Sequence, residues 1–445
     1  MSTKKDTAVT NLVVGLGTTG LSIARYLKRH DELAIFYDSR EDPPGCEELA
    51  ALFPDADVRH ADDDIPDGIE RLVVSPGVPD SHPLLEKARD EDIEVVSDIE
   101  LFARAADKPF LAVTGSNGKS TVTTLLWQMC LADGRKALAG GNLGEPALDL
   151  LEHDDTDIYV LELSSFQLQR THTLPAEVAV LLNVTPDHLD WHRDEAEYRA
   201  AKYRIFDDVD AAVINRIDDE AARRTSHCGR VVSFGLDEPA SDDYGIREED
   251  GQKYLARGDA LLLSIRDLAL YGVHNQLNAL AALAAGELIG LERATMLQVL
   301  VEFPGLPHRM QFVARIGAVD YINDSKATNV AAAVASIDSV DGMLVLIAGG
   351  DGKGGDFADL AAAVEGKLRG AVLIGQDAGK IARALDTVMP VHFAENMEVA
   401  VHMAASCAES DDTVLLAPAC ASFDQFDNYM ARGDAFVVAV EGLRL

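Results

Sequence analysis

The sequence predicts an α/β protein with three domains, each built around a mostly parallel sheet. Short apolar runs alternate with longer helical stretches along most of the chain, which is typical of βαβ units. The alternation begins afresh twice, so we expect domains over 1–97, 98–305 and 306–445. A length of 445 residues fits this division, since a domain usually holds roughly 100–200 residues.

The first block opens with a strand, a glycine turn and a helix. Leu12–Val14 is the predicted strand, and the helix extends through Tyr26. Leu33–Phe36 and Leu72–Val74 are further apolar runs that predict strands. Ligand sites in open α/β sheets lie beyond the carboxyl ends of the strands, so the residues after each run are candidates for binding.

The second and third blocks repeat this order. In the second, Ser120–Leu131 is predicted as a helix that ends before Gly134. The third follows Phe303–Gly305, a predicted hinge. The predicted strands of the two blocks are Phe110–Val113, Ile158–Leu161, Val178–Leu182, Met343–Ala348, Ala371–Ile374 and Val414–Leu416.

The composition is strongly acidic, with 75 acidic against 39 basic residues and a formal net charge of −36. This charge disfavours nucleic-acid binding, which depends on Lys and Arg neutralising phosphates. A site for an anionic substrate must therefore be locally basic. Because the acidic residues are spread along the chain, we expect them on the surface, and adaptation to a salty environment is a hypothesis.

The sequence favours a cytoplasmic protein without membrane insertion. No apolar run approaches the roughly 20 residues needed to cross a bilayer, and the first residues are polar rather than signal-like. The five cysteines are scattered and form no CxxC pair, so we expect buried free thiols rather than a disulfide framework or a zinc site.

The first glycine loop, Gly15–Gly20, matches GxGxxG after a strand and before a helix. Asp38 follows at a spacing that suits the ribose-binding acid of an NAD or NADP site, an interpretation that the motif alone leaves open. The rest of the chain offers no partner for nicotinamide chemistry. We expect the helix N-terminus to face a phosphate or diphosphate, with Asp38–Arg40 and Ser75 beside the attached nucleoside.

The second glycine loop predicts an ATP site. It follows a strand, starts a helix and resembles a P-loop, although it is shorter than GxxxxGK[ST]. Backbone N–H groups would wrap the phosphates, while Lys119 neutralises charge and the Ser120 hydroxyl binds Mg²⁺. The predicted nucleotide-binding residues of this loop are Gly115, Ser116, Asn117, Gly118, Lys119, Ser120 and Thr121.

Two further residues follow apolar runs beside this loop. Glu162 ends one of them, where its charge needs a partner, and this is the usual place for a metal-binding acid near a P-loop. His188, in Asn183–Asp190, could ligate a metal or orient a charged group, although a lone histidine is as often structural.

In combination these motifs resemble the Mur ligase family. The short P-loop, Glu162, Asn183–His188 and Tyr271–Ala279 are similar to its central ATPase domain. Asp38–Arg40 with the first glycine loop, and the C-terminal motifs Asn323–Asn329, Gly349–Lys353 and Ser422–Phe426, resemble those members that add D-glutamate. The resemblance covers essentially the whole chain.

This resemblance implies a Rossmann-like N-terminal domain, a central P-loop ATPase domain and a Rossmann-like C-terminal domain. It implies a monomer that phosphorylates the alanyl carboxylate of UDP-N-acetylmuramoyl-L-alanine with ATP and lets the amine of D-glutamate attack the acyl phosphate. Mg²⁺ ions, two by resemblance, and lysines would offset the repulsion between the anionic partners.

The resemblance also assigns roles to single residues. Lys119 and Ser120 would hold the ATP phosphates and Mg²⁺, Glu162 one magnesium, and His188 the second metal or the substrate carboxylate. Lys202 matches the lysine that is carbamylated in this family, and the resulting anion would support a metal.

The remaining assignments by resemblance concern binding. The nucleotide would contact Asn275, Asn278, Arg309 and Asp324. D-glutamate would contact Lys326, Thr328, Lys353, Ser422 and Tyr429, and the UDP-sugar would contact Thr18, Thr19, Asp38, Ser39, Arg40, Ser75, Asn142 and His188. The sequence departs from the family pattern at Tyr429, where Phe is usual, and at Thr18, where an apolar residue is expected.

Two alternatives stay open. The chain could be another amide ligase of the family, although the Asp-Asn-Pro-Arg signature of diamino-acid-adding members is absent from the sequence and folate-type ligases lack such a first domain. It could also be a nucleotide-gated binding protein with a dead site, against which the intact Lys119, Glu162, His188 and Lys202 argue.

Overall fold

The computed structural model describes residues 10–56, 58–60, 64–185, 188, 191–270, 272–385 and 390–444. Pro186, Asp187, Leu189, Asp190 and Tyr271, which belong to the motifs above, lie outside the described residues. The chain divides into two compact units. Unit 1 comprises Met1–Ile265 and Leu277–Val299, and unit 2 comprises Arg266–Gln276 and Leu300–Leu445.

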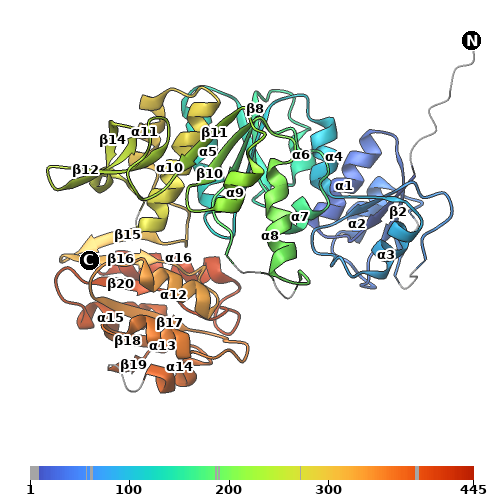
Figure 1. Cartoon of the computed structure of the whole chain (residues 1–445). Helices are drawn as coiled ribbons and strands as arrows, with labels where there is room; N and C mark the ends of the chain where they lie inside the picture. Colours follow the sequence, from blue (N-terminus) through green and yellow to red (C-terminus); the bar gives the residue numbers. More distant parts are fainter. Residues whose placement is uncertain are drawn as a thin grey trace, which may run out of the picture. The chain divides into compact units, whose positions relative to one another are not determined.

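Unit 1 begins with a five-stranded sheet, in the blue part of Figure 1, whose order is β3-β2-β1-β4-β5 and whose strands are all parallel. The order of the strands reverses at β1, since β2 and β3 are added on one side of it and β4 and β5 on the other. Open α/β sheets bind ligands at such a point. Its elements are β1 (Thr10–Val14), α1 (Thr18–Arg29), β2 (Leu33–Tyr37), α2 (Cys46–Leu52), β3 (Val58–Arg59), β4 (Arg71–Val74), α3 (Pro83–Asp90) and β5 (Glu94–Val96).

A nine-stranded sheet follows, in the order β14-β13-β12-β11-β10-β9-β6-β8-β7. The strand before the second glycine loop, β6, lies between β8 and β9 and is buried along its whole length. The elements are α4 (Asp98–Ala105), β6 (Phe110–Thr114), α5 (Lys119–Ala132), β7 (Ala137–Gly141), α6 (Ala147–Leu150), β8 (Ile158–Glu162), α7 (Ser165–Gln169), β9 (Val178–Leu181), α8 (Glu195–Tyr203), η1 (Arg204–Phe206), β10 (Ala211–Asn215), α9 (Asp219–Arg224), β11 (Arg230–Phe234), β12 (Tyr244–Glu249), β13 (Gln252–Arg257), β14 (Ala260–Ser264), η2 (Ile265–Asp267), α10 (Val273–Leu288) and α11 (Arg293–Glu302).

The far edge of this sheet is antiparallel, which the strand-helix alternation did not predict. Glu249 pairs with Gln252 across Asp250–Gly251, and both turn residues have positive φ, at 52° and 73°. An Asp-Gly pair with this conformation is a strong signal for a two-residue hairpin. The Asp-Gly pair in the sequence therefore indicates this hairpin, but a hairpin is not part of the βαβ pattern from which the strands were predicted.

Unit 2 holds a six-stranded sheet in the order β15-β16-β20-β17-β18-β19, parallel except for the β15–β16 pair. Successive residues of β17 face opposite cores: Leu344 and Leu346 enter one, Val345 and Ile347 the other, as expected for a strand with helices on both sides. The elements are β15 (Gln311–Ile316), β16 (Val319–Asn323), α12 (Val330–Asp338), β17 (Leu344–Gly349), α13 (Ala358–Val364), β18 (Leu368–Ile374), α14 (Ala378–Leu385), β19 (Val391–Phe393), α15 (Met397–Cys407), β20 (Thr413–Leu416) and α16 (Tyr429–Gly442).

The first two sheets share one apolar core, which explains why they form a single unit. Ile23 and Leu27 of α1 belong to the same buried cluster as Leu148 of α6. Arg25 reinforces the junction, since its Nε and Nη2 donate to the two carboxylate oxygens of Asp149 at 3.0 and 2.6 Å.

The α/β class and the eleven predicted elements are confirmed as strands or helices, with ends that differ by a few residues. The five cysteines, which all lie in described parts of the chain, are free thiols, but only Cys130 and Cys420 are buried and the other three are partly exposed. In the part of the chain that the structure describes, no helix has the length and apolar character to cross a membrane.

Candidate active site

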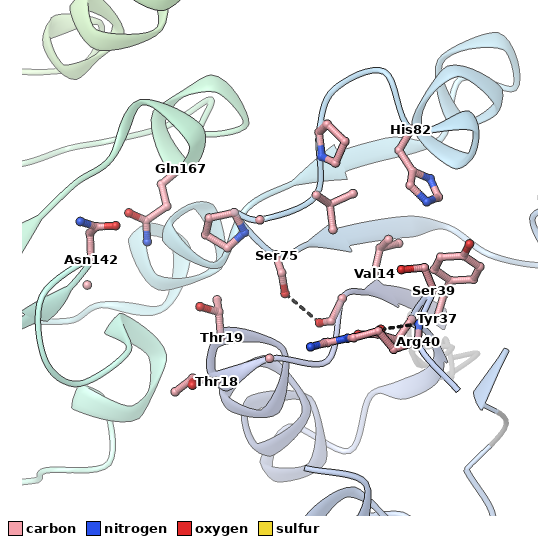
Figure 2. Close-up of a pocket in the computed structure, with 18 residues that line it drawn as sticks. Val14, Thr18, Thr19, Tyr37, Ser39, Arg40, Ser75, His82, Asn142 and Gln167 are labelled. Atoms are coloured by element: carbon pink, nitrogen blue, oxygen red, sulfur yellow. Dashed lines mark hydrogen bonds and ion pairs between the residues drawn. The ribbon is translucent and has the colours of Figure 1, made fainter. Parts of the chain in front are cut away.

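A cavity of about 590 Å³ opens beside the first glycine loop of unit 1. Figure 2 shows Thr18 and Thr19 at the start of α1, Ser75 after β4, Asn142 after β7 and Gln167 on α7 around it, with Ser39, Arg40 and His82 toward the other end. The cavity is lined by Val14, Gly15, Gly17, Thr18, Thr19, Tyr37, Asp38, Ser39, Arg40, Ser75, Pro76, Gly77, Val78, Pro79, His82, Gly141, Asn142 and Gln167. Seven residues predicted to contact the UDP-sugar thus lie around one cavity.

The glycines of the first loop serve two purposes. Gly15 has φ +94°, and a Cβ on Gly20 would lie 1.9 Å from the Gly15 carbonyl oxygen, so the backbone itself requires both glycines. Gly17, in contrast, has open space where a side chain would be and lines the cavity. Its missing side chain leaves room for a ligand at the N-terminus of α1, where free N–H groups favour an anion.

Asp38 lines the cavity and also supports this loop through hydrogen bonds. It is 4% exposed and accepts hydrogen bonds from Leu16 N at 2.7 Å and from Arg40 Nε and Nη2 at 2.8 and 2.7 Å. The hydrogen bonds from Arg40 and the backbone lower the pKa of Asp38 to about 2, against the opposing effect of burial. Ser39 and the half-exposed Arg40 are therefore better placed than Asp38 to meet a ligand.

The second glycine loop ends in Gly118, the N-cap of α5, with φ +86°. A Cβ there would come within 2.3 Å of Asn278 Oδ1, so the loop passes directly against α10. Lys119 Nζ donates to the Gly115 and Ser116 carbonyl oxygens, both at 2.9 Å. The ammonium group is thus held over the loop, where it can exchange these two carbonyl contacts for contacts with phosphate oxygens.

Glu162 lies beside this loop, because it pairs with Val113 in the β6–β8 register. Its side chain is buried; Oε1 accepts a hydrogen bond from Asn142 Nδ2 at 2.7 Å, while Oε2 has no hydrogen-bond partner among the described residues. A buried, unsatisfied carboxylate oxygen is costly unless a cation pairs with it. This oxygen fits a Mg²⁺ ligand, although the described residues contain no group of three His, Cys, Asp or Glu side chains arranged to hold a metal.

Lys202 is 2% exposed and approaches the same loop from α8. Its Nζ donates to the Gly115 carbonyl oxygen at 2.8 Å and lies 5.0 Å from the centre of the Tyr198 ring. Lys119 and Lys202 therefore share one carbonyl, and two ammonium groups that bind the same oxygen atom repel each other. Conversion of one of them to an anion would remove this repulsion.

His188 is exposed and has φ +53°, a conformation uncommon for residues other than glycine and enriched at functional sites. Its carbonyl oxygen accepts hydrogen bonds from Trp191 N and His192 N at 3.1 and 2.9 Å. Its ring meets the Phe166 ring edge to face at 4.9 Å. The backbone turn and this aromatic contact together fix where the imidazole lies.

In unit 2, three residues predicted to bind D-glutamate follow neighbouring parallel strands. Lys326 follows β16, Lys353 follows β17, and Ser422 follows β20, the strand between them. Lys326 Nζ lies 4.2 Å from the centre of the Tyr429 ring. The tyrosine that departs from the family pattern thus packs against a predicted substrate lysine, and Thr328 N donates to the Lys326 carbonyl at 2.8 Å.

The predicted nucleotide residues occupy different settings. Asn275 and Asn278 are both buried on α10, and Arg309 is exposed in unit 2. Asp324 is buried, which raises its pKa, and it accepts hydrogen bonds from Met310 N at 3.3 Å and from the Ser336 hydroxyl.

Sequence reasoning missed several residues of both sites. Gln167 lines the cavity, but its position three residues after Ser164 indicates only a capping box, which it also forms. Tyr37 and His82 line the cavity with ring centres 5.3 Å apart. Arg432 is 1% exposed and donates to carbonyls of Ser325 and Cys420 at 2.9 and 3.0 Å, a role without any local signal.

Three stretches of the chain match the domains of one enzyme family. Residues 9–97 match the Mur ligase MurD-like N-terminal domain, residues 113–286 the Mur ligase middle domain, and residues 308–420 the Mur ligase glutamate ligase domain. The chain belongs to the Mur ligase family, and the prediction of three such domains is confirmed.

Curated relatives match nearly the whole chain. The UDP-N-acetylmuramoylalanine--D-glutamate ligase of Legionella pneumophila (strain Paris) is 45% identical over 442 residues, which cover 97% of this chain and 99% of that protein. The ligase of the same name from Nitrosococcus oceani is 48% identical over 437 residues, covering 97% and 96%.

Solved structures share the fold at low identity. The UDP-N-acetylmuramate-alanine ligase of Thermotoga maritima is 18% identical with a TM-score of 0.58, covering 98% of this chain and 99% of that one. A pseudomurein peptide ligase type C from Methanothermus fervidus is also 18% identical, with a TM-score of 0.57, covering 98% and 100%.

Proposed function

We propose that this chain is an ATP-dependent ligase that joins D-glutamate to UDP-N-acetylmuramoyl-L-alanine through an acyl phosphate. One observation carries the proposal: Asn142 lines the cavity of the first glycine loop and also donates to Glu162 beside the second loop at 2.7 Å. A substrate held in the cavity can therefore reach the phosphoryl-transfer centre. The names of the full-length relatives support the same reaction.

The uridine diphosphate end of the substrate would occupy the cavity. Its diphosphate would lie at the N-terminus of α1 near Gly17, Thr18 and Thr19, where backbone N–H groups offset its charge. Ser39 and Arg40 would contact the nucleoside, and the muramoyl-alanine end would extend toward Asn142.

The second glycine loop would hold the ATP phosphates through Lys119 and its backbone N–H groups. Ser120, Glu162, His188 and a carbamate on Lys202 would hold two Mg²⁺ ions, which when bound neutralise phosphate and carboxylate charge. Two observations support this assignment: Glu162 Oε2 has no hydrogen-bond partner among the described residues, and the Lys202 amine is buried. Asn275, Asn278, Arg309 and Asp324 would contact the rest of the nucleotide.

The reaction then consists of two displacements. An oxygen of the alanyl carboxylate attacks the γ-phosphorus of ATP, and ADP leaves. The uncharged amine of D-glutamate attacks the carbonyl carbon of the acyl phosphate, the nitrogen loses a proton, and phosphate leaves as the amide forms. D-glutamate would be held by Lys326, Thr328, Lys353, Ser422 and Tyr429, whose two ammonium groups match its two carboxylates.

We also propose domain boundaries at 97/98 and 305/306, a monomeric enzyme and a cytoplasmic location. The boundaries are supported by the three sheets, each of which falls within one of the three ranges.

Phosphate release measured with UDP-N-acetylmuramoyl-L-alanine and ATP tests the function. Release should depend on D-glutamate and should not occur with L-glutamate. Lys119→Ala should abolish it while calorimetry still detects the UDP-substrate, because the lysine lies at the other glycine loop. Release that is independent of D-glutamate, or binding of NADH in the cavity, contradicts the proposal.

A further inference from the structure

A buried arginine supports the wall of the cavity. Arg170 follows α7 and is 3% exposed. Its Nη2 donates to the Val78 carbonyl at 2.7 Å, and its Nη1 donates to the Ser75 carbonyl at 3.5 Å. Both carbonyls belong to the loop after β4 that lines the cavity, so a residue of the middle domain holds a wall of the predicted UDP site.

The guanidinium of Arg170 depends on these contacts. Burial lowers its pKa to about 10, and Asp80 approaches its Nη2 only at 3.6 Å. A buried charge is tolerated where hydrogen bonds replace its hydration. The positions of the two carbonyls and of the guanidinium are therefore mutually constrained.

The other face of Arg170 meets an aromatic cluster that leads to His188. Its guanidinium carbon lies 5.5 Å from the centre of the Trp191 ring. The Trp191 ring lies 4.2 Å from that of Phe166, which in turn contacts the His188 ring at 4.9 Å. Trp191 N also donates to the His188 carbonyl at 3.1 Å, so the tryptophan supports the backbone of this histidine directly and its ring through Phe166.

We propose that Arg170 and Trp191 are positioning residues that fix the separation between the UDP cavity and His188. The inference rests on the proposed function, in which one substrate is held at both ends, by its diphosphate in the cavity and by its carboxylate near His188. The separation of the two sites must then match the length of the substrate. A displacement of about 1 Å at such a site can lower the rate up to about 100-fold.

Substitutions on each side of the contact test the proposal. Arg170→Met removes the donors while keeping a long apolar chain, and it should weaken the binding of UDP, measured by calorimetry, and lower kcat, each by about tenfold. Trp191→Ala should lower kcat similarly but leave UDP binding unchanged, because Trp191 does not line the cavity. Trp191→Phe, which keeps an aromatic face, should restore most of kcat.

Two matched controls separate positioning from general destabilisation. Arg204 also donates from a partly buried guanidinium to a backbone carbonyl, that of Thr171 at 2.7 Å, but does not line the cavity. Trp127 is the other of the two tryptophans, and its indole donates to the Ala137 carbonyl at 3.0 Å. Arg204→Met and Trp127→Ala should lower Tm without changing UDP binding, and with kcat within about twofold of the parent.

The double variant Arg170→Met/Trp191→Ala should lose no more kcat than the more impaired single variant, because both changes break one link. If the losses of kcat in the two single variants multiply in the double variant, or if kcat for Trp191→Ala equals that of Trp127→Ala, the proposal is overturned.

If the parent enzyme shows no D-glutamate-dependent turnover, the proposed function fails. The emission of Trp191 in a Trp127→Phe protein then decides the link: UDP should change it, and Arg170→Met should abolish the change although UDP still binds at higher concentration.

Discussion

Asp98 illustrates how a single buried carboxylate affects stability. It is the first residue of α4, is 1% exposed, and accepts a hydrogen bond from Gln167 Nε2 at 3.1 Å. Burial raises its pKa to about 6. Between the unfolded value of 3.8 and this value the native state binds more protons than the unfolded state, so its contribution to stability is present at low pH and is lost as the pH rises through 6.

Asp98→Asn should therefore stabilise the protein only at higher pH. Asparagine keeps an oxygen for Gln167 and has no charge to bury, so the gain in the free energy of unfolding should be small near pH 4 and reach up to about 3 kcal/mol near pH 8. Urea unfolding at both pH values measures it, with the exposed Asp107→Asn as the control. An equal gain at both pH values would show that the ionisation of Asp98 is not responsible.

The two lysines that share the Gly115 carbonyl should respond differently to replacement. Lys202→Ala should keep under about 1% of activity and recover part of it in formate or acetate, because a small carboxylate can take the place of the proposed carbamate. Lys119→Ala should be equally inactive and should not recover, since no anion can replace its cation. Steady-state phosphate release measures both, and full activity of Lys202→Ala would refute the carbamate.

At the scale of elements, the proposed D-glutamate site of unit 2 depends on how three strand ends are held together. Arg432 of α16 donates to carbonyls of Ser325, Cys420 and Gly349, which follow or end β16, β20 and β17. Its Nε also donates to Ser325 Oγ at 3.0 Å, and burial lowers its pKa to about 10. One side chain thus connects the loops that carry Lys326, Lys353 and Ser422.

Arg432→Met should disturb all three loops at once. Several buried acceptors lose their donor, so the free energy of unfolding should fall by about 2–4 kcal/mol and KM for D-glutamate should rise about tenfold or more. Binding of UDP should not change, because the cavity belongs to unit 1. Arg315→Met, at a half-exposed arginine of the same unit, is the control, and a variant that loses stability without a change in KM would contradict the positioning role.

At the scale of the whole molecule, the net charge of −36 should make stability depend on salt. Tm should rise when KCl increases from about 0.01 to 0.3 M, because the screening length falls from about 30 Å to below 10 Å and self-repulsion weakens. NaCl should give the same curve, since screening depends on ionic strength. A Tm that stays flat or falls with added KCl would rule out repulsion as the dominant effect of the acidic surface.

The sequence by itself determined the strand-loop-helix order, both glycine loops and the acid that ends β8. These features depend on neighbouring residues: Gly15, Gly20 and Gly118 are required by local backbone geometry, and Glu162 stands out because a charge ends an apolar run. Such signals extend over a few residues, so they can be recognised without knowing how the rest of the chain folds.

Only the tertiary structure decided which of these signals meet. Asn142 and Glu162 are 20 residues apart in sequence, Arg170 and Val78 are 92 apart, and Arg432 and Ser325 are 107 apart. It also showed that Asp38, which lines the cavity, accepts hydrogen bonds from Leu16 N and Arg40, a support for the loop that its spacing did not reveal. Hydrogen bonds of this range arise from packing and strand order, which local propensity and periodicity do not encode.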